Sequence, residues 1–201
     1  MAGNTVNTNT DLNSEALIAE AAAWRLASLL LERPRGSWKR DVEALAREVV
    51  ATEIVSAARA AGEATEESYQ KLFGPGGAVS PREVSYCGFE DPGRLMAMLQ
   101  GFYQAFAFQP EREESIDHIA VEAGFVGYLF LKEAYARTQE NAEAAAVTRT
   151  ARERFIQRHL KRCVVGVMER LDAVPDYIRG ALSWLAETVG EGARDIPPLG
   201  T

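Results

Sequence analysis

Three ionisable side chains lie within six positions of one another in the stretch EESIDHIAVEAGF, residues 113–125. Asp117 and His118 are adjacent, and Glu122 follows His118 by four residues, so a helix would place the imidazole and the second carboxylate on one face. Such a group could form a metal site, a catalytic acid–base pair, a helix cap or part of a surface that recognises another protein. The remainder of the chain has to distinguish these four alternatives.

The sequence offers little support for metal or covalent chemistry. The chain has one further histidine, His159, which is flanked by basic residues, and it has no Glu-x-x-His sequence of the kind that di-iron bundles use. No Gly-x-Ser-x-Gly nucleophile elbow occurs, and Ser80 and Ser85 lie near no identifiable base. The stretch GPGGAVS lacks the Lys-Ser/Thr ending of a phosphate-binding loop. An enzyme is therefore not predicted, and a helical metalloenzyme is the least favoured alternative.

The bulk properties are those of an ordinary globular protein with acidic character. The 201 residues fit one domain, and the formal net charge of −7 disfavours nucleic acid and anionic lipid, which are bound mainly through Lys and Arg. The same charge favours a basic peptide. Without a signal-peptide pattern or a membrane-spanning apolar run, a cytoplasmic protein with no stable membrane insertion is expected. Cys87 and Cys163 have no paired spacing, and Cys163 is expected to be a buried thiol.

Hydrophobic periodicity predicts an all-α fold, because no segment shows the sustained alternation of a β-strand. The absence of an internal repeat favours a single globular helical bundle over a helical array. A cap near Asn13 or Ser14 is predicted to start the first helix. Helices are expected at 14–33, about 41–62, after Thr65, at 92–110, 115–138, 142–172 and 175–190. The predicted layout is a disordered tail at 1–12, a helical domain at 13–190 and a flexible tail at 191–201.

A long loop is predicted at residues 74–93. It holds five of the chain's sixteen glycines and three prolines. Loops of this length inside a compact domain are usually functional or disordered. Its apolar residues Val79, Val84, Tyr86 and Phe89 argue against disorder, so we expect the loop to be functional.

The simplest interpretation of SIDHIAVE is the start of a helix. Ser115 would cap it, Asp117 would favour the helix dipole, and His118 with Glu122 would form a pair that contributes tenths of a kcal/mol. This interpretation leaves unexplained the apolar run that follows, which makes the helix apolar on nearly all sides and therefore central to its fold. An Asp-His pair at the mouth of a buried helix, near an apolar loop, is how a binding groove would be built.

Three stretches together resemble the TorD/DmsD/NarJ family of redox-enzyme maturation chaperones. They are LFGPGGAVSPREVSY at 72–86, DHIAVEAGF at 117–125 and FIQRHL at 155–160. The loop is most similar to versions from the nitrate-reductase-like and type II DMSO reductase branch. Ser115 occupies a position where the family usually has proline, whereas the Asp-His pair is kept.

The resemblance implies an all-helical chaperone of the TorD-like type, not an enzyme. It implies that the partner is the molybdopterin-containing catalytic subunit of an oxidoreductase, bound through its N-terminal, twin-arginine-type leader until cofactor insertion and assembly are complete. No cofactor of its own is expected, and the family leaves room for transient contact with the molybdenum cofactor of the client. A monomer is expected, with a dimer as the alternative.

The residues expected to bind the client come from the loop and the start of the helix. Asp117 and Glu122 would meet basic residues, and Tyr86 and Phe125 would contact the apolar part of the leader. His118 would orient Asp117 or titrate near neutral pH. The remaining predicted contacts are Ser80, Pro81 and Glu83. The main alternative is a non-catalytic helical scaffold that binds another folded protein.

Overall fold

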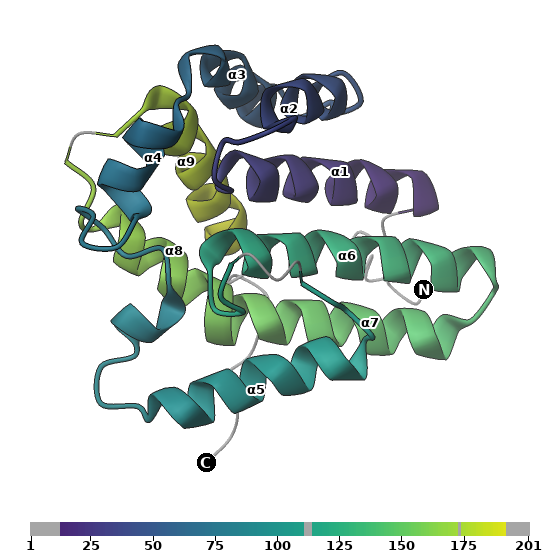
Figure 1. Cartoon of the computed structure of the whole chain (residues 1–201). Helices are drawn as coiled ribbons and strands as arrows, with labels where there is room; N and C mark the ends of the chain where they lie inside the picture. Colours follow the sequence, from purple (N-terminus) through teal and green to yellow (C-terminus); the bar gives the residue numbers. More distant parts are fainter. Residues whose placement is uncertain (1–12, 111–113, 173, 192–201) are drawn as a thin grey trace, which may run out of the picture.

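The computed structural model describes residues 13–110, 114–172 and 174–191, and this part of the chain is helical without a β-strand (Figure 1). The α-helices are α1 (Ser14–Leu30), α2 (Trp38–Ala46), α3 (Thr52–Ala60), α4 (Glu66–Phe73), α5 (Pro92–Ala105), α6 (Ile119–Thr138), α7 (Ala142–Phe155), α8 (Lys161–Met168) and α9 (Asp176–Glu191). Short 3₁₀ turns lie at η1 (Ala61–Glu63) and η2 (Glu83–Tyr86), and a π-helical turn at η3 (Ile156–Leu160). The all-α prediction is confirmed, whereas the predicted tail at 1–12 and residues 192–201 lie outside the described residues.

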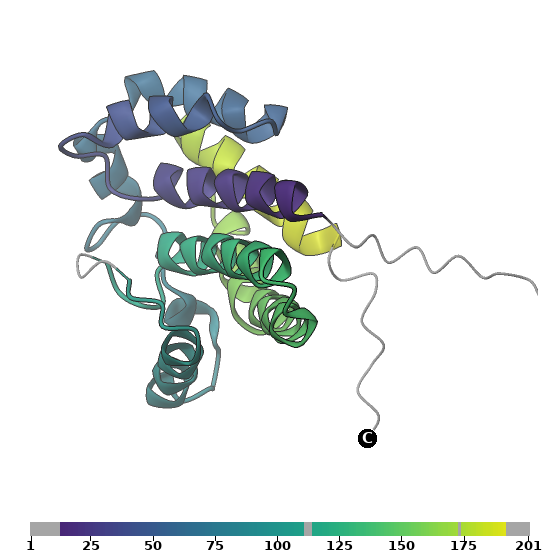
Figure 2. The same cartoon turned by 90° about the vertical axis from the view of Figure 1, so that its right-hand side faces the viewer.

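Helix α6 is at the centre of the fold, between α1 on one side and α7 on the other (Figures 1 and 2). The helices α1 and α6 can approach closely because α6 carries Gly127, where an added Cβ atom would lie 3.1 Å from the Cβ of Trp24 and 3.2 Å from the carbonyl oxygen of Ala21. Helix α9 packs against α3, α8 and α1, which completes the core.

Helix α5 lies along the lower side of the molecule in Figure 1 and is attached through aromatic side chains. The rings of Tyr103 and Phe125 have centroids 4.8 Å apart, and those of Phe125 and Phe155 are 4.7 Å apart. Phe102 adds an edge contact to Phe155 at 5.3 Å. These pairs join α5, α6 and α7 in one apolar cluster. Aromatic contacts of this kind stabilise a fold by more than the burial of their apolar surface alone.

Several predicted helix boundaries are wrong. The helix expected at 41–62 is two helices, α2 and α3. The chain turns between them at Val49, which is buried, and Val50, which is exposed. The helix expected at 142–172 contains the π-turn η3 and ends at Met168. The helix expected from Ser115 begins at Ile119, and α9 runs past the predicted stop at Gly190.

Other expectations agree with the structure. The Asp91 side chain accepts a hydrogen bond from the Gly93 backbone and caps α5, with Pro92 in the first turn as predicted. Asn13 caps α1 in the same way. Cys163 is buried, and both cysteines are free thiols. Within the described ranges, no helix combines the length and apolar character needed to cross a membrane.

Candidate functional site

The loop and the start of α6, far apart in the sequence, are joined by backbone hydrogen bonds. Arg82 and His118 form an isolated antiparallel bridge. The Glu83 amide donates to the Asp117 carbonyl at 2.8 Å, and the Ile119 amide donates to the Pro81 carbonyl at 2.8 Å. The two stretches that carry the family resemblance therefore form one unit, which we call the clamp, comprising residues 80–86 and 115–122.

Asp117 holds the clamp together through its side chain. Its carboxylate has no exposed surface and accepts hydrogen bonds from Nε of Arg82 at 2.9 and 3.2 Å. The Val84 amide and the Ser115 hydroxyl also donate to it, at 3.3 and 2.5 Å. The prediction that His118 orients Asp117 is wrong, because Arg82 and the loop backbone do so. The predicted Ser115 cap is also wrong, since α6 begins four residues later.

His118 is the N-cap of α6. Its Nδ1 accepts a hydrogen bond from the Ala120 amide at 3.1 Å, so the ring proton is on Nε2. Nε2 lies 3.2 Å from the Tyr69 hydroxyl, which in turn donates to the Leu31 carbonyl at 3.2 Å. Burial lowers the pKa of His118 to about 4, against a raising effect of Asp117. The prediction that His118 titrates near neutral pH is therefore contradicted. Its predicted pairing with Glu122 is also wrong, because the ring nitrogens face the Ala120 amide and the Tyr69 hydroxyl and neither Glu122 oxygen has a hydrogen-bond partner among the described residues.

Glu83 and Glu122 belong to a second buried polar group within the clamp. Glu83 lies 3.1 Å from Nδ1 of His159, which is in the π-turn η3, and 3.7 Å from Arg162. Burial raises the pKa of Glu122 well above its usual range, and the negative charges of Glu83 and Asp117 raise it further. The FIQRHL stretch thus contributes a buried partner for the loop glutamate.

Tyr86 fixes the far end of the loop against α8. Its ring covers Gly166, where a Cβ atom would lie 2.3 Å from two ring carbons. The Tyr86 hydroxyl donates to the Ser80 carbonyl, and the guanidinium of Arg170 lies over the ring at 5.0 Å. The start of the loop is joined to α4, because the Val79 amide donates to the Leu72 carbonyl at 2.9 Å. The loop is therefore anchored on three helices, α4, α6 and α8.

The structure gathers the predicted site residues but places most of them in the interior. Glu83, Asp117, Glu122 and Phe125 have no exposed surface. Phe125 belongs to the aromatic cluster with Tyr103 and Phe155, and an apolar pattern alone does not show which side of a helix faces the core. The described residues hold no group of three His, Cys, Asp or Glu side chains arranged for a metal ion.

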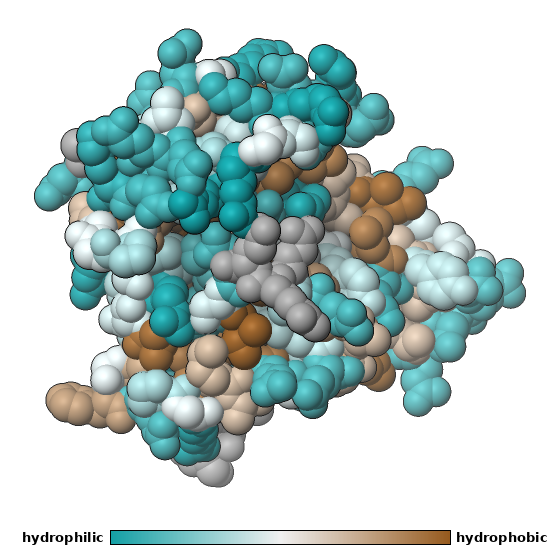
Figure 3. Space-filling model, viewed as in Figure 1, coloured by the Kyte–Doolittle hydropathy of each residue, from teal (hydrophilic) through white to brown (hydrophobic). Residues whose placement is uncertain are grey.

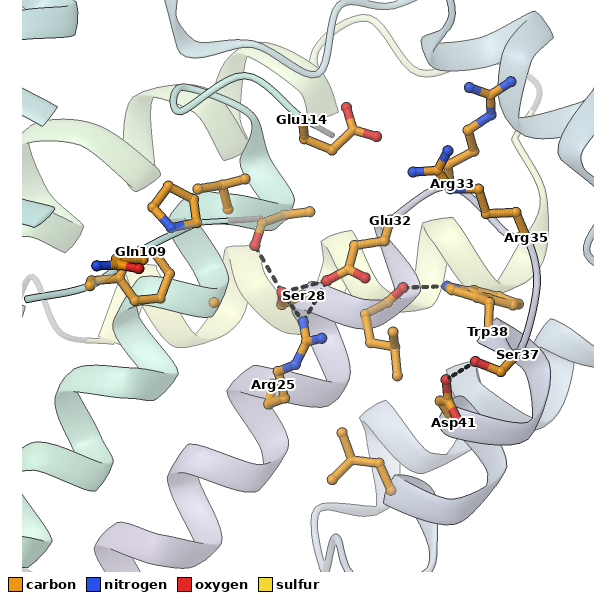
Figure 4. A pocket seen from close by; sticks show the side chains of 17 residues that line it. Arg25, Ser28, Glu32, Arg33, Arg35, Ser37, Trp38, Asp41, Gln109 and Glu114 are labelled. Atoms are coloured by element: carbon orange, nitrogen blue, oxygen red, sulfur yellow. Dashed lines mark hydrogen bonds and ion pairs between the residues drawn. The ribbon is translucent and has the colours of Figure 1, made fainter. Parts of the chain in front are cut away.

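Two hollows border the clamp at the surface. The smaller, about 450 Å³, is lined by the loop and α4, including Ser80, Pro81, Arg82, Ser115 and His118. The larger, about 610 Å³, lies between the ends of α1 and α6 and is shown in Figure 4. The two hollows share Arg33 and Glu114, so they meet at these side chains.

Glu114 is a candidate site residue that the sequence-based prediction missed. Its side chain is 27% exposed, and its carboxylate lies 3.7 Å from Nε2 of the neutral His118. No hydrogen bond joins it to another described residue, and Figure 4 shows it across the hollow from Arg33 and Arg35. Burial raises the pKa of Glu114, opposed by those two arginines. The sequence feature that could have indicated this role is the position of Glu114, four residues before His118.

Comparison with known proteins identifies the family of the chain. The family model described as nitrate reductase delta subunit matches residues 36–167, which is more than half of the chain. Among solved structures, a candidate redox enzyme maturation protein from Archaeoglobus fulgidus is 18% identical, with a TM-score of 0.52 over 85% of this chain and 93% of that chain, and it shares the fold. The chain belongs to the nitrate reductase delta subunit family, the NarJ/TorD type of redox-enzyme maturation chaperones.

Proposed function

We propose that this chaperone binds the N-terminal leader of a molybdopterin-containing catalytic subunit in the cytoplasm and holds it until cofactor insertion and assembly are complete. The observation that carries the proposal is the pair of adjoining hollows around the clamp, with Glu114 where they meet. The family membership supports the chaperone role, and the structure supplies a concave surface beside the family's own motifs.

In this proposal the clamp residues have two kinds of role. Ser80, Pro81 and His118 line the smaller hollow and would contact the leader. The buried side chains, Glu83, Asp117, Glu122 and Phe125, would act indirectly by fixing the loop against α6 and α8. Tyr86 is half-buried and would likewise position the loop, through its contact with Gly166.

The chemistry of a twin-arginine leader suits Glu114. An arginine side chain offers several N–H donors that match a carboxylate, and such charge-assisted hydrogen bonds are stronger than neutral ones. Glu114 is half-buried and has no hydrogen-bond partner among the described residues. A guanidinium from the leader would donate hydrogen bonds to its carboxylate. The net charge of −7 would attract the basic leader at longer range.

Calorimetry with a synthetic twin-arginine leader peptide tests the proposal. We expect Glu114→Gln to weaken binding by about tenfold or more, because a hydrogen bond to a charged group contributes roughly 1.5–3 kcal/mol. Glu143→Gln is the matched control, since Glu143 is an exposed acid at the start of α7, and it should bind as the wild type does. A wild-type protein that binds no leader peptide would contradict the proposed function.

A further inference from the structure

The side of α6 that faces solvent carries an apolar stripe. Its residues follow one another at intervals of three or four and are Val121, Gly124, Tyr128, Leu131 and Tyr135. Leu131 is 49% exposed and Tyr135 is 67% exposed. The solvent side of a helix in a globular protein is normally polar, and contiguous exposed apolar surface usually marks an interaction site.

Helix α1 extends this stripe. A Cβ atom at Gly124 would lie 3.0 Å from the hydroxyl of Ser28, and one at Gly127 would lie close to Trp24 and Ala21. The two helices therefore run antiparallel, and the next turn places Ile18, which is 51% exposed, at the level of Leu131. We name Ile18 together with the α6 stripe the α1–α6 seam. Figure 3 shows hydrophobic surface where α1 and α6 lie side by side.

The seam opens at one end into the larger hollow. Val121 and Gly124 line that hollow together with Glu114. From Val121 to Tyr135 the stripe covers about 21 Å at roughly 1.5 Å per residue. Leader peptides place basic residues before an apolar run of about 7–15 residues, which as a helix would be roughly 10–22 Å long. The length of the stripe matches that of a leader's apolar run. At the hollow end Glu114 supplies a carboxylate for the basic residues, in a lining that also holds Arg25, Arg33 and Arg35.

We propose that the α1–α6 seam binds the apolar run of the leader as a helix with a fixed direction. The basic residues would lie at Glu114, and the end of the apolar run would lie at Tyr135. This inference rests on the proposed function and adds to it the surface, conformation and direction of the bound segment. An amphipathic or apolar helix in a groove is recognised through side chains three and four residues apart, which is the spacing of the seam.

Matched substitutions test the location. The probe is a labelled synthetic peptide with two arginines before an apolar run of about twelve residues. Leu131→Asp should weaken its binding about tenfold or more, because burying a leucine contributes roughly 1.5–3 kcal/mol. Val165→Asp is the control, since Val165 is on α8, away from the seam, with a similar exposure of 45%. If both variants bind the probe with equal affinity, the seam is not the binding surface. The proposed function would remain intact, provided that the wild type binds the probe.

The direction is tested with photo-crosslinking groups at either end of the apolar run. The group beside the arginines should crosslink near Glu114, and the group at the far end should crosslink near Tyr135, as located by mass spectrometry. The opposite pattern would overturn the proposed direction. Light scattering of wild type and Leu131→Asp adds a further check, because a wild-type dimer that the substitution converts to a monomer would assign the seam to a second copy of the chain.

Discussion

The clamp and the α1–α6 seam, which meet at Val121, differ in the burial and polarity of their side chains. The clamp is held by buried polar groups with specific partners, such as Asp117 with Arg82 and Glu83 with His159, although the carboxylate of Glu122 has no hydrogen-bond partner among the described residues. The seam consists of apolar side chains at the surface, of which Ile18, Leu131 and Tyr135 are exposed and Tyr128 is half-buried, with its hydroxyl donating to the Phe106 carbonyl. Buried polar groups tolerate little change because each requires its own hydrogen bonds, whereas an apolar surface can be built from many residue types. Two of the stretches that carry the family resemblance, the loop and the start of α6, also build the clamp.

Phe125 tests the difference between buried residues and the exposed seam. The sequence predicted that Phe125 contacts the leader, whereas the structure places it in the core. Phe125→Ala should lower the free energy of unfolding by about 4 kcal/mol, because it removes a fully buried ring from an aromatic cluster. Urea denaturation would measure this loss. Leu131→Asp, a change at the seam, should alter stability far less, so similar losses for the two variants would remove the distinction between core and seam.

Much of the architecture was predictable from sequence. The caps at Asn13 and Asp91 and the apolar spacing indicated helices, and the structure has them. The break between α2 and α3 was not predictable, because it depends on Val49 packing into the core while Val50 remains exposed. The stretch around Asp117 and His118 was correctly expected to lie beside the loop. Its polar partners were not identified, since Arg82 and Tyr69 meet it only through tertiary contacts.

A second prediction tests whether the clamp histidine is neutral. The folded-state pKa of His118 is lowered from 6.5 to about 4, so its contribution to stability is present above pH 6.5 and lost as the pH falls toward 4. In His118→Asn, which keeps an N-cap acceptor, this loss is absent. We expect the wild type to lose up to about 3 kcal/mol relative to the variant between pH 6.5 and 4, measured by urea denaturation. Parallel stability curves for the two proteins across this range would contradict a neutral, buried His118.

The smallest expected effect tests how rigidly the clamp loop is held. Gly166→Ala should cost about 2 kcal/mol, because the new Cβ atom would lie 2.3 Å from the Tyr86 ring, whose hydroxyl is bonded to the Ser80 carbonyl. Gly101→Ala on α5 is the control: it has no atom within 4 Å of its Cβ position and should gain up to about 1 kcal/mol in helix propensity. Adding Tyr86→Ala to Gly166→Ala should remove the clash, so the combined loss should be smaller than the sum of the single losses. If Gly166→Ala is instead as well tolerated as Gly101→Ala, the loop is free to move away from α8. The surface that the clamp presents to the leader would then form only on binding, whereas the seam is already formed by the packing of α1 against α6.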